Sequence, residues 1–308
     1  MDFSRTLKDF SIEYGINLSL KIGNPPKLQS HECFCMWSDL LGFGNMLQLN
    51  NWHLNTHQKR KIYDRLKAAH SAVLYYSSFD ERNLILNDGI AKVFHLKNRL
   101  NKNVNLLHIS LYLRSCVELH MSICKTELEN NYPGCRSVLA FGESIEYLAD
   151  EIRLDDWGLN YTKPEGSAVS DFAKQQENPV IIYNPKELQM NTAFSKSFLL
   201  ENSGSKSGLP GNHLYVDKSI IDAIAKFAKR ESYKLVWKET SDELSLFVTK
   251  DKTNIDNVIM GFCFDDTMIK PTIDKYKTIV YRLKKFYPHD EKPIEFCFDL
   301  DKFSDYNV

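Results

Sequence analysis

Residues Met36–Gly44 read MWSDLLGFG, and the apolar run Cys33–Trp37 leads into them. A near-continuous apolar run of this length is typical of a β-strand that is covered on both faces. One carboxylate, Asp39, ends the run, and the glycine-flanked turn Leu41–Gly44 follows it. We therefore expect a buried strand over residues 31–39, with the rest of the domain arranged around it.

A second isolated carboxylate lies in an apolar segment further along, residues 83–94, which reads NLILNDGIAKVF. Its Asn87-Asp88-Gly89 step favours a tight turn, so residues 83–96 are predicted to form a hairpin. Asp39 and Asp88 would then lie on adjacent buried strands, beside a turn that presents backbone N–H groups. Such a pair suits a divalent cation and a phosphate. In the alternative interpretation Asp39 caps a helix and Asp88 is an ordinary turn residue.

The composition is that of a globular protein, because 43% of the 308 residues are hydrophobic and the formal net charge is -1. This charge balance gives no reason to expect a nucleic-acid or membrane partner. No apolar run approaches the roughly 20 residues that a spanning helix needs. The N-terminal segment lacks the layout of a secretory signal, and seven cysteines, an odd number, indicate reduced thiols. We expect a cytoplasmic protein.

Periodicity and turn residues predict helices over about 45–75, 104–129 and 191–201 and strands at 135–145 and 179–183, with a polar loop over 155–178. From residue 213 onward they predict a strand, a helix and a hairpin formed by YKLVW and LSLFVT. A strand VIMGFCF and a C-terminal helix after Pro271 follow. This order is typical of the α+β class, with helices packed on a mostly antiparallel sheet. We divide the chain into an N-terminal extension (1–30), a main domain (31–250) and a C-terminal extension (251–308).

Four segments together resemble the signatures of the class III nucleotidyl cyclases, which make 3′,5′-cyclic nucleotides from nucleoside triphosphates. Trp37–Phe43 is similar to the first signature, and Leu86–Ile90 to the strand-turn-strand that carries an acidic metal ligand. Arg136–Glu143 resembles the arginine-led strand, and Ala193–Glu201 the helix that follows in this family. The resemblance implies a ferredoxin-like α+β sandwich. Its details look most like the bacterial cyclases of antiviral signalling, some of which use pyrimidine triphosphates.

The resemblance also implies a site. Asp39 and Asp88 would hold two Mg²⁺ or Mn²⁺ ions, with the carbonyl of Leu40 as a further ligand. These ions activate the ribose 3′-hydroxyl and stabilise charge on the α-phosphate. Arg136 would also contact the nucleoside triphosphate. The amides of the turn would bind its β- and γ-phosphates, as anions favour helix N-termini: Leu41, Gly42, Phe43 and Gly44.

The helix signature departs from the family pattern. Where the family usually has an asparagine and, four residues later, a transition-state arginine, this chain has Ser195 and Leu199. Loss of such an arginine costs several orders of magnitude in phosphoryl chemistry. Lys196 is the nearest cation, so we name it, with Ser195, as a candidate for this half of the site. The family's sites are shared between subunits, so the resemblance implies a homodimer.

The positions that read a purine in the family also differ, because they hold Leu84 and Leu188. Adenine-type recognition is therefore unsupported, and Asn83, Lys186 or Glu187 are candidates to read a different base. Three functions fit: an active cyclase (a phosphorus-oxygen lyase) with altered base choice, a catalytically degenerate nucleotide-binding sensor or regulatory protein, and another two-metal phosphoryl-transfer enzyme such as a polymerase or nuclease.

Overall fold

A computed structural model describes residues 28–78, 81–96, 104–147, 159–162, 167–170, 181–183, 188, 190–250, 258–273, 275–289 and 292–296. The chain divides into two compact units. One comprises residues Glu32–Glu143 and Thr192–Val308, and the other Met1–His31 and Ser144–Asn191. Among the helices that lie in the described ranges, none is both long and apolar enough to cross a membrane.

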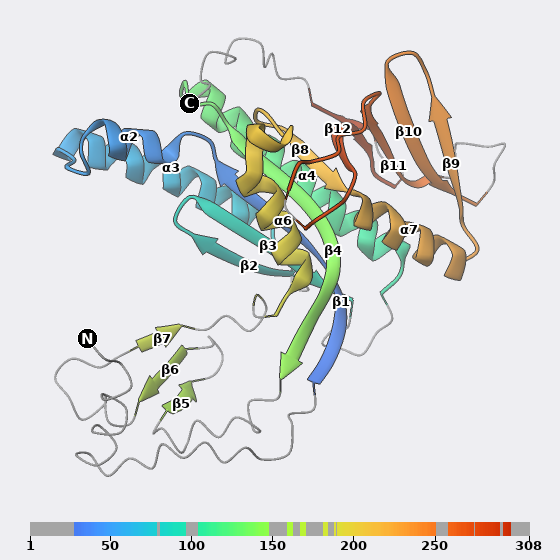
Figure 1. The fold of residues 1–308 in the computed structure, drawn as a ribbon, viewed down its shortest axis with the longest axis horizontal. Coiled ribbons are helices and arrows are strands. Elements are labelled where there is room, and N and C mark those ends of the chain that lie inside the picture. Colours follow the sequence, from blue (N-terminus) through green and yellow to red (C-terminus); the bar gives the residue numbers. More distant parts are fainter. Residues whose placement is uncertain are drawn as a thin grey trace. The chain divides into compact units, whose positions relative to one another are not determined.

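The larger unit is built on a ten-stranded sheet in the order β2-β3-β1-β4-β8-β12-β11-β10-β9, with β13 paired to β12 (Figure 1). The strands are β1 (Leu28–Leu40), β2 (Glu81–Leu86), β3 (Gly89–His95), β4 (Cys135–Tyr147), β8 (Leu214–Asp217), β9 (Lys234–Glu239), β10 (Glu243–Thr249), β11 (Val258–Asp265), β12 (Val280–Tyr287) and β13 (Ile294–Glu295). Strands β4 and β8 pair in parallel, whereas β1–β3, β2–β3, β8–β12 and the pairs from β12 to β9 are antiparallel. The predicted α+β class with a mostly antiparallel sheet is confirmed.

The helices that accompany this sheet are α2 (Phe43–Leu49), α3 (Thr56–Tyr75), α4 (Leu106–Glu129), α6 (Thr192–Ser203) and α7 (Lys218–Arg230), with a 3₁₀ turn η2 (Gly204–Ser207) after α6. Alternation along β1 assigns the faces, because successive side chains of a strand point to opposite sides. Phe34 packs its ring 6.0 Å from that of Tyr112 on α4. The next residue, Cys35, instead accepts a hydrogen bond at its sulfur from the Ser197 hydroxyl of α6. Strand β1 is therefore covered on both faces, as its apolar run predicts.

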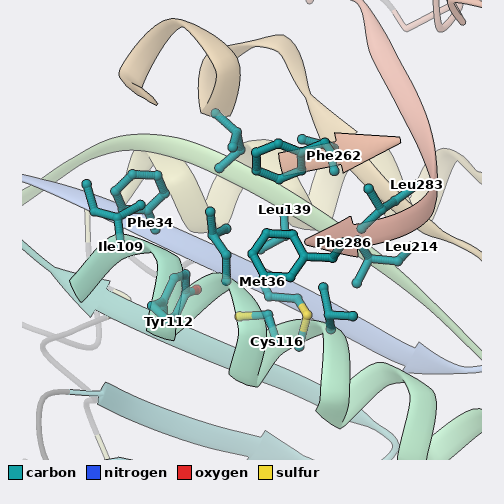
Figure 2. Close-up of a cluster of buried hydrophobic side chains, with 14 of the residues drawn as sticks. Phe34, Met36, Ile109, Tyr112, Cys116, Leu139, Leu214, Phe262, Leu283 and Phe286 are labelled. Atoms are coloured by element: carbon teal, nitrogen blue, oxygen red, sulfur yellow. The ribbon is translucent and has the colours of Figure 1, made fainter. Parts of the chain in front are cut away.

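The main core lies between the sheet and helix α4. Figure 2 shows Met36 of β1 facing Tyr112 and Cys116 of α4, with Phe286 of β12 beside them. Phe262 of β11 packs edge-on against Phe286, with ring centroids 5.3 Å apart. Side chains from β1, β11 and β12 thus enter one cluster, and β11 and β12 are parts of the main sheet.

The predicted single helix over about 45–75 is wrong, because it is two helices, α2 and α3. Asn51 and Trp52 have positive φ values of 49° and 62°, which a continuous α-helix cannot contain. Asn55 then caps α3 in a reciprocal capping box with Gln58. The polar residues that looked like a helix face in sequence form the end of one helix and the start of the next.

The predicted C-terminal helix after Pro271 is also wrong, because residues 280–287 form strand β12. The segment VYRLKKFY has apolar residues at spacings that suit either a helix or a strand. Pairing decides between them: Val280 lies opposite Asp217 of β8, and Phe286 opposite Phe262 of β11. The β-branched and aromatic side chains fill a gap in the sheet that no local propensity reveals.

In the smaller unit, β5 (Leu159–Thr162), β6 (Ser167–Ser170) and β7 (Ile181–Tyr183) form a three-stranded antiparallel sheet. The first two strands lie within residues 155–178, for which the sequence predicts a loop without regular structure. That expectation is wrong for the described residues. A strand at 179–183 is confirmed by β7, while residues 1–27, most of the predicted N-terminal extension, lie outside the described part of the chain.

Candidate functional site

The end of β1 and the β2–β3 turn meet at one edge of the larger unit. Asp39 lies opposite Gly89 in the antiparallel register, and the Leu40 N–H donates to the main-chain carbonyl of Asp88 over 3.3 Å. Asn87, at φ 58°, closes the hairpin, and its amide donates to the Asp88 carboxylate over 3.1 Å. The predicted hairpin is confirmed, and its turn brings Asp88 next to Asp39.

A tryptophan covers this junction on the α6 side of the sheet. The Trp37 ring lies over Gly89, where the Cβ of any other residue would overlap it. The ring also packs edge-on against Phe194 and Phe198 of α6, with centroids 5.6 and 5.3 Å away. The glycine after Asp88 thus serves the close approach of Trp37, and the aromatic contacts anchor α6 beside the carboxylates.

Glu201 is a third carboxylate of the site, and sequence reasoning did not assign it a role. It accepts a 3.3 Å hydrogen bond from the Trp37 indole and bonds of 3.1 and 2.8 Å from the Arg136 guanidinium. The Arg136 guanidinium also donates to the carbonyl of Leu209 over 3.3 Å. The indole and guanidinium donors in two strand signatures were the available clue, since buried donors of this kind require an acceptor.

The electrostatics of these carboxylates favour a cation. Burial, Glu201 and Asp88, in that order, raise the pKa of Asp39 from 3.8 to about 8, against the opposing charges of Arg136 and Arg65. Burial is also the main cause of the raised pKa of Glu201, although its partner Arg136 lowers it. Two guanidinium groups therefore do not compensate the three acidic groups, and an added cation would favour the charged form of Asp39.

The turn after Asp39 is fixed by buried polar contacts. The Leu41 N–H donates to the Gly134 carbonyl over 2.9 Å, and the Leu41 carbonyl accepts from Arg65 over 2.8 Å. Arg65 is itself held in a buried ion pair with Glu127 of α4. Gly42 has φ 64°, in the left-handed region that favours glycine. Of the four amides predicted to bind phosphate, that of Leu41 is therefore already used within the protein.

Lys196, the cation predicted on α6, does not line the same space as the carboxylates of its own chain. The Lys196 ammonium donates to the Phe141 carbonyl over 2.9 Å and lines an open pocket of about 630 Å³ together with Asp217 and Asp222. Asp39 and Asp88 do not line that pocket. Ser195 is exposed on α6.

Asn83, a candidate for reading the base, is not brought to this site either. Asn83 lies opposite Lys92, which in turn lies opposite Met36, so Asn83 is on the α4 face of the sheet. Its amide donates to Ser77 after α3 over 2.8 Å. Asp39 lies with Trp37 on the opposite face of the sheet, which packs against α6. Residues 186 and 187, the other candidates, lie outside the described part of the chain.

Comparison with known proteins gives similarity of structure only. No protein-family profile matches the chain, and no curated protein is significantly similar to it in sequence. Solved structures similar to it include the adenylyl cyclase CyaB from P. aeruginosa, with a TM-score of 0.39 and 9% identity over 83% of this chain and 95% of that one. The guanylyl cyclase Cya2 has a TM-score of 0.40 and 9% identity over 83% and 92%. A class III adenylyl cyclase-like ATP-binding protein from Pseudomonas aeruginosa has a TM-score of 0.36 and 11% identity over 64% and 35%.

Proposed function

We propose that the chain is a nucleotidyl cyclase, which converts a nucleoside triphosphate to a 3′,5′-cyclic nucleotide and pyrophosphate. The observation that supports this most is the junction of Asp39 and Asp88 beside Glu201, where burial and like charge raise the pKa of Asp39 to about 8. A site that holds excess acidic charge at the open end of two strands is suited to cations and to the phosphates that accompany them.

The donor set fits hard divalent ions. Asp39 and Asp88 would hold Mg²⁺ or Mn²⁺, with the Leu40 carbonyl as a further oxygen ligand. When bound, two such ions lower the pKa of a 3′-hydroxyl and stabilise charge on an α-phosphate. Glu201 already accepts hydrogen bonds from Arg136 and Trp37, so it would position Arg136 and not ligate an ion.

The rest of the chain's own contribution is orientation. Gly42, Phe43 and Gly44 present their amides at the start of α2, beside Asp39, and we assign them the terminal phosphates of the substrate. The buried Arg65–Glu127 pair holds this turn through the Leu41 carbonyl. Arg136, restrained by its bonds to Glu201, adds positive charge where the triphosphate would lie.

The cation for the transition state would come from a second copy of the chain. Lys196 points into another pocket of its own chain, so a shared site in a homodimer is the arrangement that would use it. Mixing Asp39→Asn and Lys196→Ala chains tests this, because one of the two sites in a mixed dimer would be intact. Activity in the mixture above the sum of the separate variants supports a shared site, and strict additivity contradicts it.

A second candidate function is nucleotide binding without turnover. It is favoured by the two α6 positions where the family has transition-state residues, because this chain has Ser195 and Leu199 there. Leu199 is 40% exposed and Ser195 is also exposed. Leu84, in place of a purine-reading lysine, favours a pyrimidine in either case. A pyrimidine cyclic nucleotide would fit a role in antiphage signalling.

The test is incubation of the full chain with each of the four nucleoside triphosphates and Mg²⁺ or Mn²⁺, with products identified by mass. We expect a 3′,5′-cyclic mononucleotide, lost in Asp39→Asn and Asp88→Asn. Asp64→Asn is the matched control, because Asp64 is an exposed carboxylate that pairs with Arg60 on α3. Nucleotide binding without consumption would support the second candidate, and linear or 2′-linked oligonucleotides would point to a polymerase.

A further inference from the structure

A cluster of three metal-ligating side chains lies on the opposite side of the sheet from Asp39. His120 and Cys124 come from α4, and Cys135 is the first residue of β4. All three are fully buried. One ligand atom from each residue can be chosen so that the three atoms lie within 4.8 Å of one another. The proposed function uses none of these groups.

The spacing of the ligand atoms matches a tetrahedral metal. The two sulfur atoms are 3.6 Å apart, and Nε2 of His120 lies 3.6 Å from the Cys124 sulfur. A tetrahedral zinc ion with ordinary bond lengths separates two sulfur ligands by roughly 3.8 Å and a sulfur from a nitrogen by roughly 3.5 Å. The side chains would therefore need little movement to bind the ion.

The groups around the cluster suit the thiolate and imidazole forms that bind metals. Nδ1 of His120 lies 2.8 Å from the Ser137 hydroxyl, which can hold the Nδ1–H tautomer and leave Nε2 as the ligand. The Cys135 N–H donates to the Cys124 sulfur over 3.5 Å. The hydroxyl contact orients the imidazole, and the donated N–H stabilises negative charge on the sulfur.

A candidate fourth ligand, a carbonyl oxygen, lies near the cluster. The main-chain carbonyl of Asn212, in the segment before β8, lies 3.8 Å from the Cys124 sulfur. The Asn212 side-chain nitrogen is buried and has no hydrogen-bond partner within the described residues. This nitrogen is a donor and cannot ligate a cation, so only the carbonyl of Asn212 would serve the ion.

We propose that His120, Cys124 and Cys135 bind a structural Zn²⁺ ion, with the Asn212 carbonyl as the candidate fourth donor. Binding displaces the thiol protons to solvent, and the ion then ties α4 to the start of β4 and to the segment before β8. One histidine and one cysteine four residues apart on a helix, with a second cysteine from a strand, supply three of the four ligands of a tetrahedral zinc site, and the carbonyl would close it. The proposal does not depend on the cyclase function.

The ion would also stiffen the carboxylate site. Ser137, which contacts His120, shares a 2.7 Å hydrogen bond with Ser38, the neighbour of Asp39. Gly134, the neighbour of Cys135, supplies the carbonyl that holds the Leu41 amide. Loss of the ion is therefore expected to loosen β1, which carries Asp39, and the turn that follows it.

The experiment is elemental analysis of the full chain, produced without a histidine tag in zinc-supplemented medium and freed of loose metal by gel filtration. We expect about one zinc ion per chain and its loss in Cys124→Ser and Cys135→Ser. Cys116→Ala is the matched control, because Cys116 is a buried cysteine on the same helix that lies outside the cluster. It should retain the zinc.

A second measurement protects the test against variants that do not fold. The wild-type chain is refolded with Co²⁺ in place of zinc, and its absorption is recorded. Intense thiolate-to-cobalt charge-transfer bands, which exposed carboxylates cannot produce, would support the site. Folded wild-type protein without zinc, zinc retained in both cysteine variants, copper as the sole bound metal, or cobalt without charge-transfer bands would each overturn the proposal.

Discussion

Removing the charge of Asp39 should stabilise the metal-free protein. Its pKa rises from 3.8 to about 8 on folding, chiefly through burial and then through Glu201 and Asp88. The folded state therefore binds a proton more tightly than the unfolded state does. Stability contributed by this group is complete below pH 4 and is lost as the pH rises from about 4 to 8. Asp39→Asn keeps the shape of the side chain and removes this loss.

The size of the gain follows from the shift. Because 1 pKa unit corresponds to 1.36 kcal/mol, the shift corresponds to at most about 4 kcal/mol at pH 7. Asp39 remains partly accessible, so solvent screening reduces the expected gain to about 2 kcal/mol. The gain should shrink steadily toward pH 5, where the folded and unfolded states differ less in charge.

Urea unfolding at pH 5, 6, 7 and 8 in the presence of a chelator measures this free energy. Asp64→Asn, at an exposed carboxylate, should show no comparable rise with pH. Added Mn²⁺ should stabilise the wild type, by about 2.7 kcal/mol at one hundred times its dissociation constant, and leave Asp39→Asn unchanged. A destabilised Asp39→Asn at pH 8, or a gain that does not vary with pH, would refute the proposed electrostatics of this site.

Two further substitutions test the supports of the site. Gly89→Ala should displace the Trp37 ring, cost about 1–3 kcal/mol in urea unfolding and reduce the near-ultraviolet circular dichroism of the tryptophan. Gly44→Ala is the control, because its new methyl group would meet only a flexible side chain at 3.9 Å. Equal effects of the two substitutions would contradict the packing argument. Arg65→Met leaves the Glu127 carboxylate buried and unpaired and should cost about 3–5 kcal/mol, whereas adding Glu127→Leu should recover much of that loss; no recovery in the double variant would show that the charge is not the cause.

The local parts of the site could be predicted from the sequence. The apolar run before Asp39 and the Asn-Asp-Gly step specify a strand and a tight hairpin through nearest-neighbour chemistry alone, and both are confirmed. Helix α4 was also predicted, because 24 residues with helical spacing leave little ambiguity. These elements place each carboxylate at the end of its own strand or turn, and the pairing of β1 with β3 then brings Asp39 and Asp88 together.

The remaining features depend on pairings between distant residues. Glu201 meets Trp37 across 164 positions, and no local pattern records that meeting. Strand β12 was predicted as a helix because its pattern is ambiguous until β8 and β11 flank it. Cys124 and Cys135 are only 11 positions apart, but their spacing matches no familiar metal motif, and the third partner, His120, lies within a helix where a histidine is usually structural.

The two faces of β1 explain how one strand can serve both proposed sites. Cys35, Trp37 and Asp39 face α6, whereas Ser38, one residue from Asp39, faces α4 through its bond to Ser137. A slip of one residue in the β1 register would exchange the two sets and move Asp39 away from Glu201. The Ser38–Ser137 bond on one face and the Trp37–Glu201 bond on the other both oppose such a slip. Contacts on the α4 face, including a bound ion at His120, therefore help to set the position of the carboxylate on the α6 face.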